Sequence, residues 1–271
     1  MNHQNDQNQA NDEELYWHTI LSLRQIESES VWDAIDKLRK AGTSRILGRA
    51  LQWCQDPDAY LRSIGVSILA QFGPDTKTFP QESTQMILSM IATEQDHEVI
   101  TSLISAVSFR ELEQGVLWLV SLSEHPSQDI RWRVAWALPI PNNQDSPTYP
   151  TSIETLLKLM NDIDPYVRDW ATFSISMTQE DSPIVSEALL QRLNDSDFDT
   201  RSEAAVGLAK RRIQAGIEPL IAYLQSDHVG ELFVEAAQMY ADRRLKPALL
   251  ELQRWWDVNP ELLDQAIAAC S

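Results

Sequence analysis

Glycine and cysteine are both scarce in this chain of 271 residues, which contains eight glycines and two cysteines. A β-propeller needs glycine-rich turns between its short strands, so the shortage of glycine argues against that architecture. Cys54 and Cys270 lie too far apart in the sequence, and are too few, for a disulfide framework or a zinc site. We therefore expect both cysteines to be ordinary reduced thiols.

Long apolar runs and cationic side chains are also lacking. No stretch approaches the roughly 20 apolar residues of a membrane-spanning helix, and the first residues have neither the basic start nor the apolar core of a signal peptide. The chain has 22 lysines and arginines against 40 aspartates and glutamates, which gives a formal net charge of -18. This balance argues against anionic membranes and nucleic acids as partners. We expect a cytoplasmic protein with a basic or neutral partner.

One short pattern recurs along the chain. It consists of an acidic turn, then an apolar residue or threonine followed by arginine, then a small residue three positions later. Clear copies contain Arg62, Arg168 and Arg201, and a weaker copy contains Arg131; in two further copies Thr101 and Phe233 take the place of arginine. The copies are spaced about 30 to 40 residues apart, which is typical of stacked helix pairs.

Each copy of the pattern contains two apolar stretches with helical period and no strand alternation. The sequence therefore predicts an all-α fold, a right-handed α-solenoid of about eight antiparallel helix pairs. The predicted pairs are residues 14–26 with 31–38, 44–54 with 58–72, 83–94 with 96–109, 112–123 with 128–138, 151–161 with 165–177, 183–194 with 198–212, 216–226 with 229–243, and 247–256 with 260–267.

Three segments define the predicted domain organisation. Residues 13–271 are expected to form a single solenoid, because stacked repeats cannot bury their apolar faces separately. Residues 1–12 are rich in asparagine and glutamine and poor in apolar side chains, so we expect a disordered tail. Residues 139–150 contain four prolines and are expected to form a non-helical loop or a hinge between repeats.

The units resemble HEAT repeats, in particular the short HEAT-like repeats of phycobilin lyase subunits, over nearly all residues after about residue 44. The resemblance is more specific for fold than for function, because HEAT arrays serve as scaffolds, inhibitors, lyase subunits and, in one branch, alkylpurine DNA glycosylases. It implies that the recurrent aspartate and arginine bridge neighbouring units. The implied pairs are Asp58 with Arg62, Asp164 with Arg168, and Asp197 with Arg201.

The two middle repeats differ from the others on one face of their second helices. On a helical wheel, the positions one, two and five residues after the arginine lie opposite the buried face. The resemblance to HEAT arrays implies that this face is concave. Large aromatic side chains there are typical of a partner-binding surface or a ligand cleft. The candidate partner-binding residues are Trp132, Arg133, Trp136, Asp169, Trp170 and Phe173.

A packing role for the same aromatic residues is the alternative. Trp132 and Trp136 would then lie under the 139–150 loop, and Trp170 with Phe173 would fill a layer between repeats. A second candidate feature is a basic edge at two helix ends one repeat apart. Its cations either complement helix C-termini or contact a phosphate or an acidic partner. The residues of this edge are Lys210, Arg211, Arg212, Arg243 and Arg244.

Motifs of catalysis and metal binding are missing from the sequence. It contains no glycine-rich phosphate loop, no Gly-x-Ser-x-Gly elbow and no His-Glu-x-x-His. His97, His125 and His228 fall in the turns of different repeats, too far apart to share one metal ion. We therefore expect no catalytic residues, no metal and no cofactor.

The function that the sequence favours is a non-enzymatic, monomeric scaffold for a protein partner, such as an adaptor, an assembly factor or an immunity-type inhibitor. One alternative is a HEAT-like alkylpurine DNA glycosylase with its aromatic cleft at Trp132, Trp136 and Trp170 and with Arg133 and Asp169 beside them. Another is a bilin lyase-type subunit, which the style of the repeats suggests.

Overall fold

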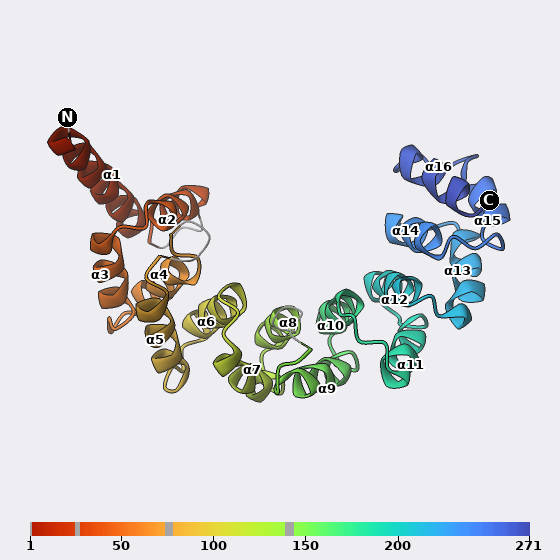
Figure 1. Ribbon diagram of the computed structural model, residues 1–271, viewed down its shortest axis with the longest axis horizontal. Coiled ribbons are helices and arrows are strands. Elements are labelled where there is room, and N and C mark those ends of the chain that lie inside the picture. The colour runs from red at the N-terminus through yellow and green to blue at the C-terminus, as the bar shows by residue number, and fades with distance from the viewer. Residues whose placement is uncertain (1, 25–27, 74–77, 139–143) are drawn as a thin grey trace. The chain divides into compact units, whose positions relative to one another are not determined.

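The computed structural model describes residues 2–24, 28–73, 78–138 and 144–271, and these residues form helices, turns and no strand. The all-helical prediction is confirmed. Contacts within the chain divide it into two compact units, residues 1–121 and 122–271. Both units are built from pairs of helices joined by short turns (Figure 1).

In the first unit, α2, α4 and α6 pack side by side, with α3 and α5 against α4 (Figure 1). The helix α1 packs on α2. The 3-10 turn η2 runs directly into α7, near the end of which the two units are divided. The elements are α1 (Asn2–Ser22), α2 (Glu29–Ala41), α3 (Ser44–Trp53), α4 (Ala59–Ala70), α5 (Pro80–Ile91), α6 (His97–Phe109), η2 (Glu113–Gly115) and α7 (Val116–Leu122).

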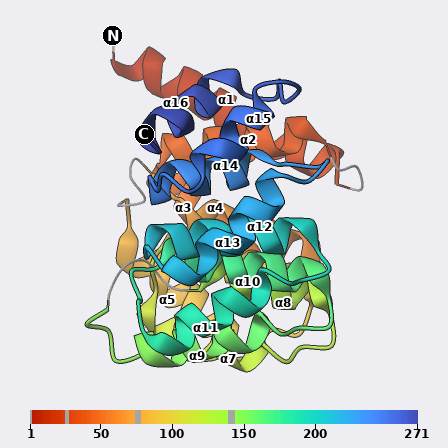
Figure 2. The same ribbon diagram turned by 90° about the vertical axis from the view of Figure 1, so that its right-hand side faces the viewer.

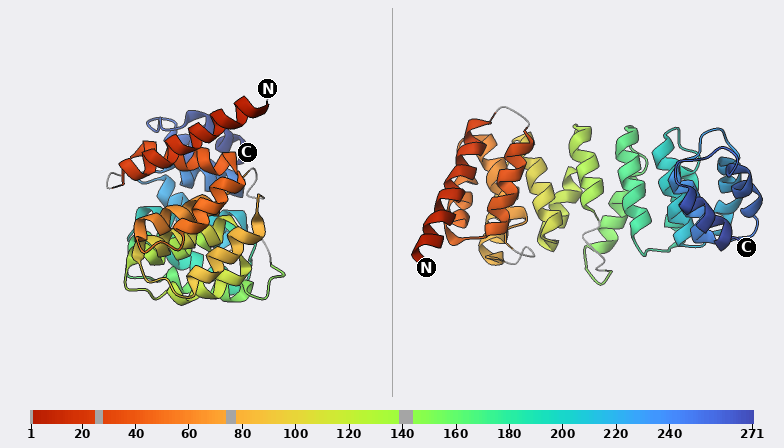
Figure 3. Two further views of the ribbon diagram at one scale, coloured as in Figure 1. Left: turned by 90° about the vertical axis from the view of Figure 1, so that its left-hand side faces the viewer. Right: turned by 90° about the horizontal axis from the view of Figure 1, so that it is seen from above.

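In the second unit, α8, α10, α12, α14 and α16 form a row in which each helix packs on the next; we call it the even row. The helices α9, α11, α13 and α15 pack against it as a second layer (Figure 2). Seen from above, the helices of this unit lie side by side (Figure 3). The elements are α8 (Gln128–Ala137), α9 (Tyr149–Leu159), α10 (Pro165–Met177), α11 (Pro183–Arg192), α12 (Phe198–Lys210), η3 (Gln214–Gly216), α13 (Ile217–Leu224), α14 (Glu231–Tyr240), α15 (Lys246–Leu252) and α16 (Pro260–Ala269).

The N-terminal segment differs from the disordered tail that the sequence predicts for residues 1–12. Residues 2–22 form one helix, α1, and residue 1 lies outside the described part of the chain. Trp17 is only 2% exposed, and its ring meets that of Trp53 edge to face at 4.6 Å. Glu13 is also buried and pairs with Arg45 at 2.6 Å. These contacts anchor the C-terminal half of α1. The N-terminal half is also helical, although its residues have the asparagine- and glutamine-rich composition expected of a disordered tail.

The proline-rich segment 139–150, predicted to be a loop or a hinge, overlaps the start of a helix. Residues 139–143 lie outside the described residues, and α9 begins at Tyr149 with Pro150 in its first turn. Proline suits this position because the first amides of a helix have no partner inside the helix. The prediction of a non-helical segment therefore fails at its last two residues.

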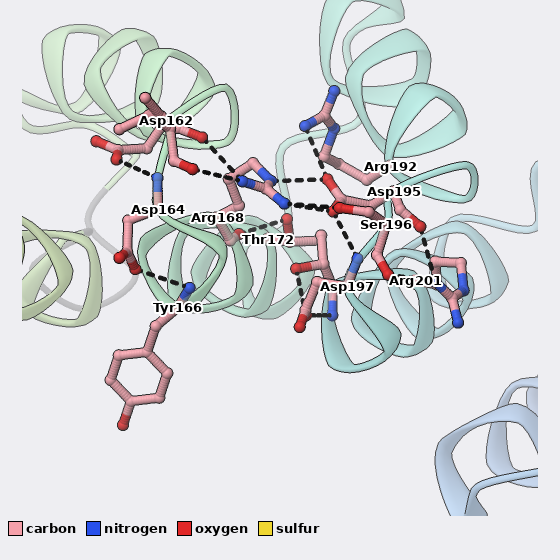
Figure 4. Close-up of polar contacts among 12 residues, drawn as sticks. Asp162, Asp164, Tyr166, Arg168, Thr172, Arg192, Asp195, Ser196, Asp197 and Arg201 are labelled. Atoms are coloured by element: carbon pink, nitrogen blue, oxygen red, sulfur yellow. Dashed lines mark hydrogen bonds and ion pairs between the residues drawn. The ribbon is translucent and has the colours of Figure 1, made fainter.

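The turn inside each helix pair is organised by carboxylates. Asp164 lies at the N-cap of α10 and accepts hydrogen bonds from the amides of Tyr166 at 3.0 Å and Val167 at 3.3 Å. Such a cap satisfies amides that the helix itself leaves unpaired. The carboxylate of Asp162, two residues before the cap, accepts a hydrogen bond from the amide of Asp164 at 2.9 Å (Figure 4). Equivalent pairs in other turns are Asp56 with Asp58, Glu94 with Asp96, and Asp195 with Asp197.

The N-caps also correct the alignment of two repeats. Asp96 caps α6 and Gly230 lies at the N-cap of α14. The recurrent arginine stands four residues after the cap in the complete copies, so the equivalent residues are Ile100 and Val234. The sequence alignment placed Thr101 and Phe233 there, each displaced by one residue. Both turns keep the usual spacing, with Glu94 and His228 two residues before the N-caps, so the displacement comes from the sequence alignment, which started from Asp96 and Asp227.

Candidate functional site

The recurrent arginines have a structural role that links consecutive repeats of the same unit. Arg168 donates to the two carboxylate oxygens of Asp195 at 2.8 and 2.7 Å, and to the carbonyls of Asp162 and Ile163 in its own turn (Figure 4). The side chains of Arg168 and Asp195 are only 12% and 4% exposed. The hydrogen bond to Asp195 raises the pKa of Arg168.

The same ion pair occurs in two other places. Arg131 pairs with Asp162 at 2.7 Å, and Arg62 pairs with Glu94 at 2.8 Å. We call the three pairs the arginine ladder. The pairing expected from the resemblance, Asp164 with Arg168, is wrong in its partner, because Asp164 is occupied as an N-cap and the arginine reaches the first carboxylate of the following turn.

Arg201 occupies the ladder position in α12 and has no carboxylate partner in the part of the chain that the structure describes. It donates to the carbonyls of Asp195 and Ser196 in its own turn and lies over the ring of Phe198 at 5.5 Å. The residue two positions before the next cap is His228, where the complete copies have an acid. The ladder within the second unit therefore ends at Asp195.

Four aromatic rings from two neighbouring helices of the even row lie in contact; we call them the aromatic cluster. Trp132 of α8 stacks on Trp170 of α10 with ring centroids 5.7 Å apart. Tyr166 meets Trp132 edge to face at 5.3 Å, and Phe173 meets Trp170 edge to face at 5.6 Å. All four side chains are partly or fully exposed. The cluster therefore combines ring packing between repeats with an aromatic surface open to solvent.

A cation and a carboxylate complete one side of this cluster. The guanidinium of Arg133 lies over the Trp132 ring at 4.5 Å, a favourable position for a cation on an aromatic face. The carboxylate of Asp129 accepts hydrogen bonds from the Trp132 indole at 2.9 Å and from Arg133 at 3.4 Å. Asp129, Trp132 and Arg133 form the α8 triad, in which each polar group has a partner.

The other side of the cluster has unpaired polar atoms. The Oδ1 atom of Asp169 and the indole Nε1 atom of Trp170 are buried and have no hydrogen-bond partner among the described residues. Burial raises the pKa of Asp169 to about 7, and the negative charges of Glu203, Asp199 and Asp197 add to the shift. This carboxyl is therefore largely protonated below neutral pH.

Glu203 on the adjacent α12 is in a similar state. Burial raises its pKa to about 7, although Lys210 and a hydrogen bond from Ser176 oppose the shift. The Lys210 amine lies 3.1 Å from the sulfur of Met177, and its charge acts on Glu203 without a salt bridge between the two described side chains. Neither Glu203 nor Asp169 makes a salt bridge with any described residue. Two carboxyls with raised pKa values on adjacent helices are typical of a functional site.

Five of the six candidate partner-binding residues are thus brought together on α8 and α10. The sixth, Trp136, lies one helical turn after Trp132 and is partly buried. The sequence hypothesis missed Tyr166, Asp129 and Glu203. Tyr166 stands four residues before Trp170, and Asp129 stands four residues before Arg133, so helical spacing alone is a signal for both.

The basic edge is mostly engaged within the protein. Arg211 donates to carbonyls at the C-terminal end of α10, among them Ile175 at 2.8 Å and Thr178 at 2.9 Å. Arg212 donates to the carbonyl of Tyr240 at 3.4 Å, and Arg244 pairs with Asp242 at 2.9 Å. Lys210, Arg211 and Arg212 border a hollow of about 490 Å³, and Arg243 is exposed. These contacts favour the helix-terminus interpretation for Arg211.

No three histidine, cysteine, aspartate or glutamate side chains converge as metal ligands in the part of the chain that the structure describes. Within that part, no helix has both the length and the apolar character needed to cross a bilayer.

Comparison with known proteins gives the following similarities. No protein-family model matches the chain. Protein YibA of Escherichia coli strain K12 is 24% identical over 253 residues, which cover 91% of this chain and 85% of YibA. The X-ray structure of Escherichia coli YibA aligns with a TM-score of 0.73 and 21% identity, over 96% of this chain and 94% of that one. The fold is that of helical repeat proteins.

Designed and engineered proteins are similar as well. A designed armadillo repeat protein, described as a complex with the peptide (KR)4, aligns with a TM-score of 0.50 and 18% identity, over 83% of this chain and 99% of that one. A further engineered protein aligns with a TM-score of 0.52 and 17% identity, over 93% of this chain and 76% of that one. The expectation of a helical repeat fold is confirmed by these structures together with that of YibA.

Proposed function

We propose that this chain is a non-enzymatic, monomeric, cytoplasmic scaffold that binds a protein partner on the even row of its second unit. The observation that carries the proposal is the aromatic cluster with Asp169 beside it. Clustered tryptophan and tyrosine side chains are enriched among the residues that contribute most to binding at protein interfaces. The three-residue α8 triad and the partly exposed Trp170 give this face both apolar and charged groups.

Charge favours a basic partner. The net charge of the chain is -18, and carboxyls continue from the aromatic cluster onto α12 and α14. Asp199, Glu203 and Glu235 are all at least partly exposed there. An acidic surface increases the rate at which a basic partner associates. The complex of a designed armadillo repeat protein with a peptide of lysine and arginine is an analogy that points the same way.

The stacked rings support one other candidate. Two tryptophans 5.7 Å apart with a carboxyl next to them are parts that a HEAT-like alkylpurine DNA glycosylase would use to hold a base. The surrounding negative charge opposes this candidate, because DNA binding requires cations along the phosphate backbone. The style of the repeats suggests a further candidate, a bilin lyase-type subunit. A visible pigment that co-purifies with the chain would support it.

Partner capture tests the proposal. Wild type, Trp170→Ala and Trp255→Ala would be immobilised and exposed to nuclease-treated lysate of the source organism. Trp255 is 50% exposed and lies after α15, so its substitution removes the same side chain outside the cluster. We expect a protein that wild type and Trp255→Ala retain and that Trp170→Ala loses. The purified protein must then bind with at least a tenfold weaker Kd to Trp170→Ala; equal binding to all three baits would contradict the proposal.

A further inference from the structure

The free polar atoms beside the aromatic cluster indicate which side chain of the partner is held there. We propose that the partner contributes an arginine whose guanidinium lies between the carboxyl groups of Asp169 and Glu203, next to the indole of Trp170. This inference rests on the proposed function and adds the chemistry of the partner. The occupant is an extended, arginine-containing segment of a protein.

Unpaired buried atoms are the first argument. Asp169 Oδ1 is an acceptor and Trp170 Nε1 is a donor, and both are buried without partners on consecutive residues of α10. Buried polar atoms in folded proteins are nearly always hydrogen-bonded, and Asp169 and Trp170 are only partly buried as whole residues, so a bound partner can reach these atoms with small side-chain shifts. A guanidinium supplies donors to the carboxyl, and a backbone carbonyl of the same segment accepts from the indole. A peptide containing arginine therefore satisfies both atoms.

The α8 triad is the second argument, because it contains the same kinds of group with the cation in place. Arg133 lies 4.5 Å from the Trp132 ring centre and is paired with Asp129. Trp132 stacks on Trp170, and Asp169 precedes Trp170 in the chain. On the α10 side, the tryptophan and the carboxyl are present and the guanidinium is absent. The chain thus holds one arginine on this stack, and the tryptophan and carboxyl of α10, in a different order along their helix, offer the same chemistry to a guanidinium of the partner.

The cations of the chain near this position are committed elsewhere. Arg168 is paired with Asp195, and Arg201 donates to carbonyls of its own turn. Lys210 lies against the sulfur of Met177. The remaining charged neighbours of the two carboxyls, Asp197, Asp199 and Glu235, are acids. Although the charge of Lys210 acts on Glu203, no described cation forms an ion pair with either carboxyl, so a cation of the partner can pair with both.

Arginine fits this position better than lysine. A guanidinium is planar and can donate to two carboxyl groups while it stacks against an aromatic ring. An ammonium is more strongly hydrated and offers a point charge without a flat face. We therefore expect this face to bind an arginine peptide more tightly than a lysine peptide of equal charge.

Synthetic peptides test the inference. The probes are (Ser-Arg-Gly)4, its lysine counterpart (Ser-Lys-Gly)4 and its citrulline counterpart, which keeps the planar shape and loses the charge. Calorimetry at pH 8 and low salt would give Kd for the wild-type chain and for Asp169→Asn, Glu203→Gln and Trp170→Ala. Glu154→Gln is the matched control, since Glu154 is exposed on α9 in the other layer and its substitution removes one negative charge. Circular dichroism would confirm that each variant is folded.

We expect the arginine peptide to bind the wild type more tightly than the lysine peptide by at least a few-fold, and the citrulline peptide to lose binding. Asp169→Asn and Glu203→Gln should each raise Kd about tenfold, and Glu154→Gln should change it less than twofold. Absence of wild-type binding, or equal affinity for the arginine and lysine peptides, would overturn the inference.

The variants separate this inference from the proposed function. If Trp170→Ala weakens the peptide complex while the two carboxyl variants bind like the wild type, the face binds a partner and the position of the guanidinium is wrong. If none of the variants changes Kd, the peptide binds elsewhere and the inference fails. The partner-capture experiment then decides independently whether the aromatic cluster is an interface.

Discussion

Asp169 is a partly buried acid without a partner, and it should weaken the fold at neutral pH. Its pKa is about 7 in the folded chain, above the value of about 3.9 expected in an unfolded chain. Between these pH values the folded chain binds more protons than the unfolded chain, so its stability falls as pH rises. The loss is complete above about pH 7 and absent below about pH 4.

Replacing this acid by its amide should therefore stabilise the protein. At pH 8, Asp169→Asn is expected to raise the free energy of unfolding by about 1 to 3 kcal/mol, because the amide has no charge to desolvate. Near pH 4 the change should be close to zero. Urea unfolding at both pH values measures it, with Glu154→Gln as the control. A stabilisation of equal size at both pH values would contradict the expected protonation.

Helix α4 packs against α3 through a glycine. A Cβ atom on Gly65 would lie 2.8 Å from the carbonyl oxygen of Ala50 and 2.8 Å from the amide nitrogen of Cys54. These are backbone atoms, which cannot move without displacing α3. Gly65→Ala should destabilise the protein by about 2 kcal/mol, since overpacking in a filled core costs about 1 to 3 kcal/mol.

A second glycine-to-alanine substitution in the same helix pair, at Gly48 of α3, should have the opposite effect on stability. Nothing lies within 4 Å of a Cβ atom placed on Gly48 in α3. Alanine in a helix is favoured over glycine by about 0.5 to 1 kcal/mol, so Gly48→Ala should stabilise the fold. Thermal unfolding of both variants measures the pair. Destabilisation by Gly48→Ala would show that this position is packed.

The arginine ladder offers a comparison of two equivalent positions. Arg168 has the carboxylate of Asp195, whereas Arg201 has only the carbonyls of its own turn as hydrogen-bond acceptors. Arg168→Ala removes the two-oxygen partner of a nearly buried carboxylate, which keeps one ion pair with Arg192 at 3.0 Å, so the loss should be about 1 to 3 kcal/mol, below that of a fully unpaired buried charge. Arg201→Ala should cost less, because it strands no charge. Equal losses in urea unfolding would mean that the turn carbonyls, rather than the carboxylate, account for the role of the arginine.

The helices were predictable from the sequence, whereas the residue pairs that join neighbouring repeats were less predictable. Apolar period and the acidic turns located the helices after α1 to within a few residues, whereas α1 begins at Asn2, well before the predicted residue 14. The ladder partner was not predictable, because the two acids of one turn, such as Asp162 and Asp164, look alike in sequence. Only the geometry shows that the second caps a helix and that the first accepts the arginine of the preceding repeat.

The candidate site was predictable in part. Helical spacing placed Trp132, Trp170 and Phe173 on one face, and they are in contact. The importance of Glu203 depends on burial and on a neighbour from another helix, and neither property can be read from local spacing. The raised pKa of its carboxyl arises from packing of α12 that only the structure describes.

The chain as a whole was expected to be one solenoid, and its contacts divide it into two compact units. Repeats in such arrays interact mainly with their neighbours, so stability can vary from one unit to another. Hydrogen exchange tests this in the full chain. Arg168→Ala should speed exchange of amides in α10 and α12 and leave those in α3 and α4 unchanged. An equal increase in both units would support a single cooperative solenoid.

The order of the ladder residues within a repeat has an evolutionary consequence. A segment from Asp162 to Asn194 begins with the acid that meets the preceding arginine, and it contains Arg168, which meets the acid at the start of the next segment. Such a segment is compatible with a copy of itself. Tandem duplication of its coding sequence would regenerate the same ion pair at the new junction. Deletion of a copy would restore the original ion pair at the original junction. Lineages of this protein can therefore change their number of repeats without first inventing a new contact.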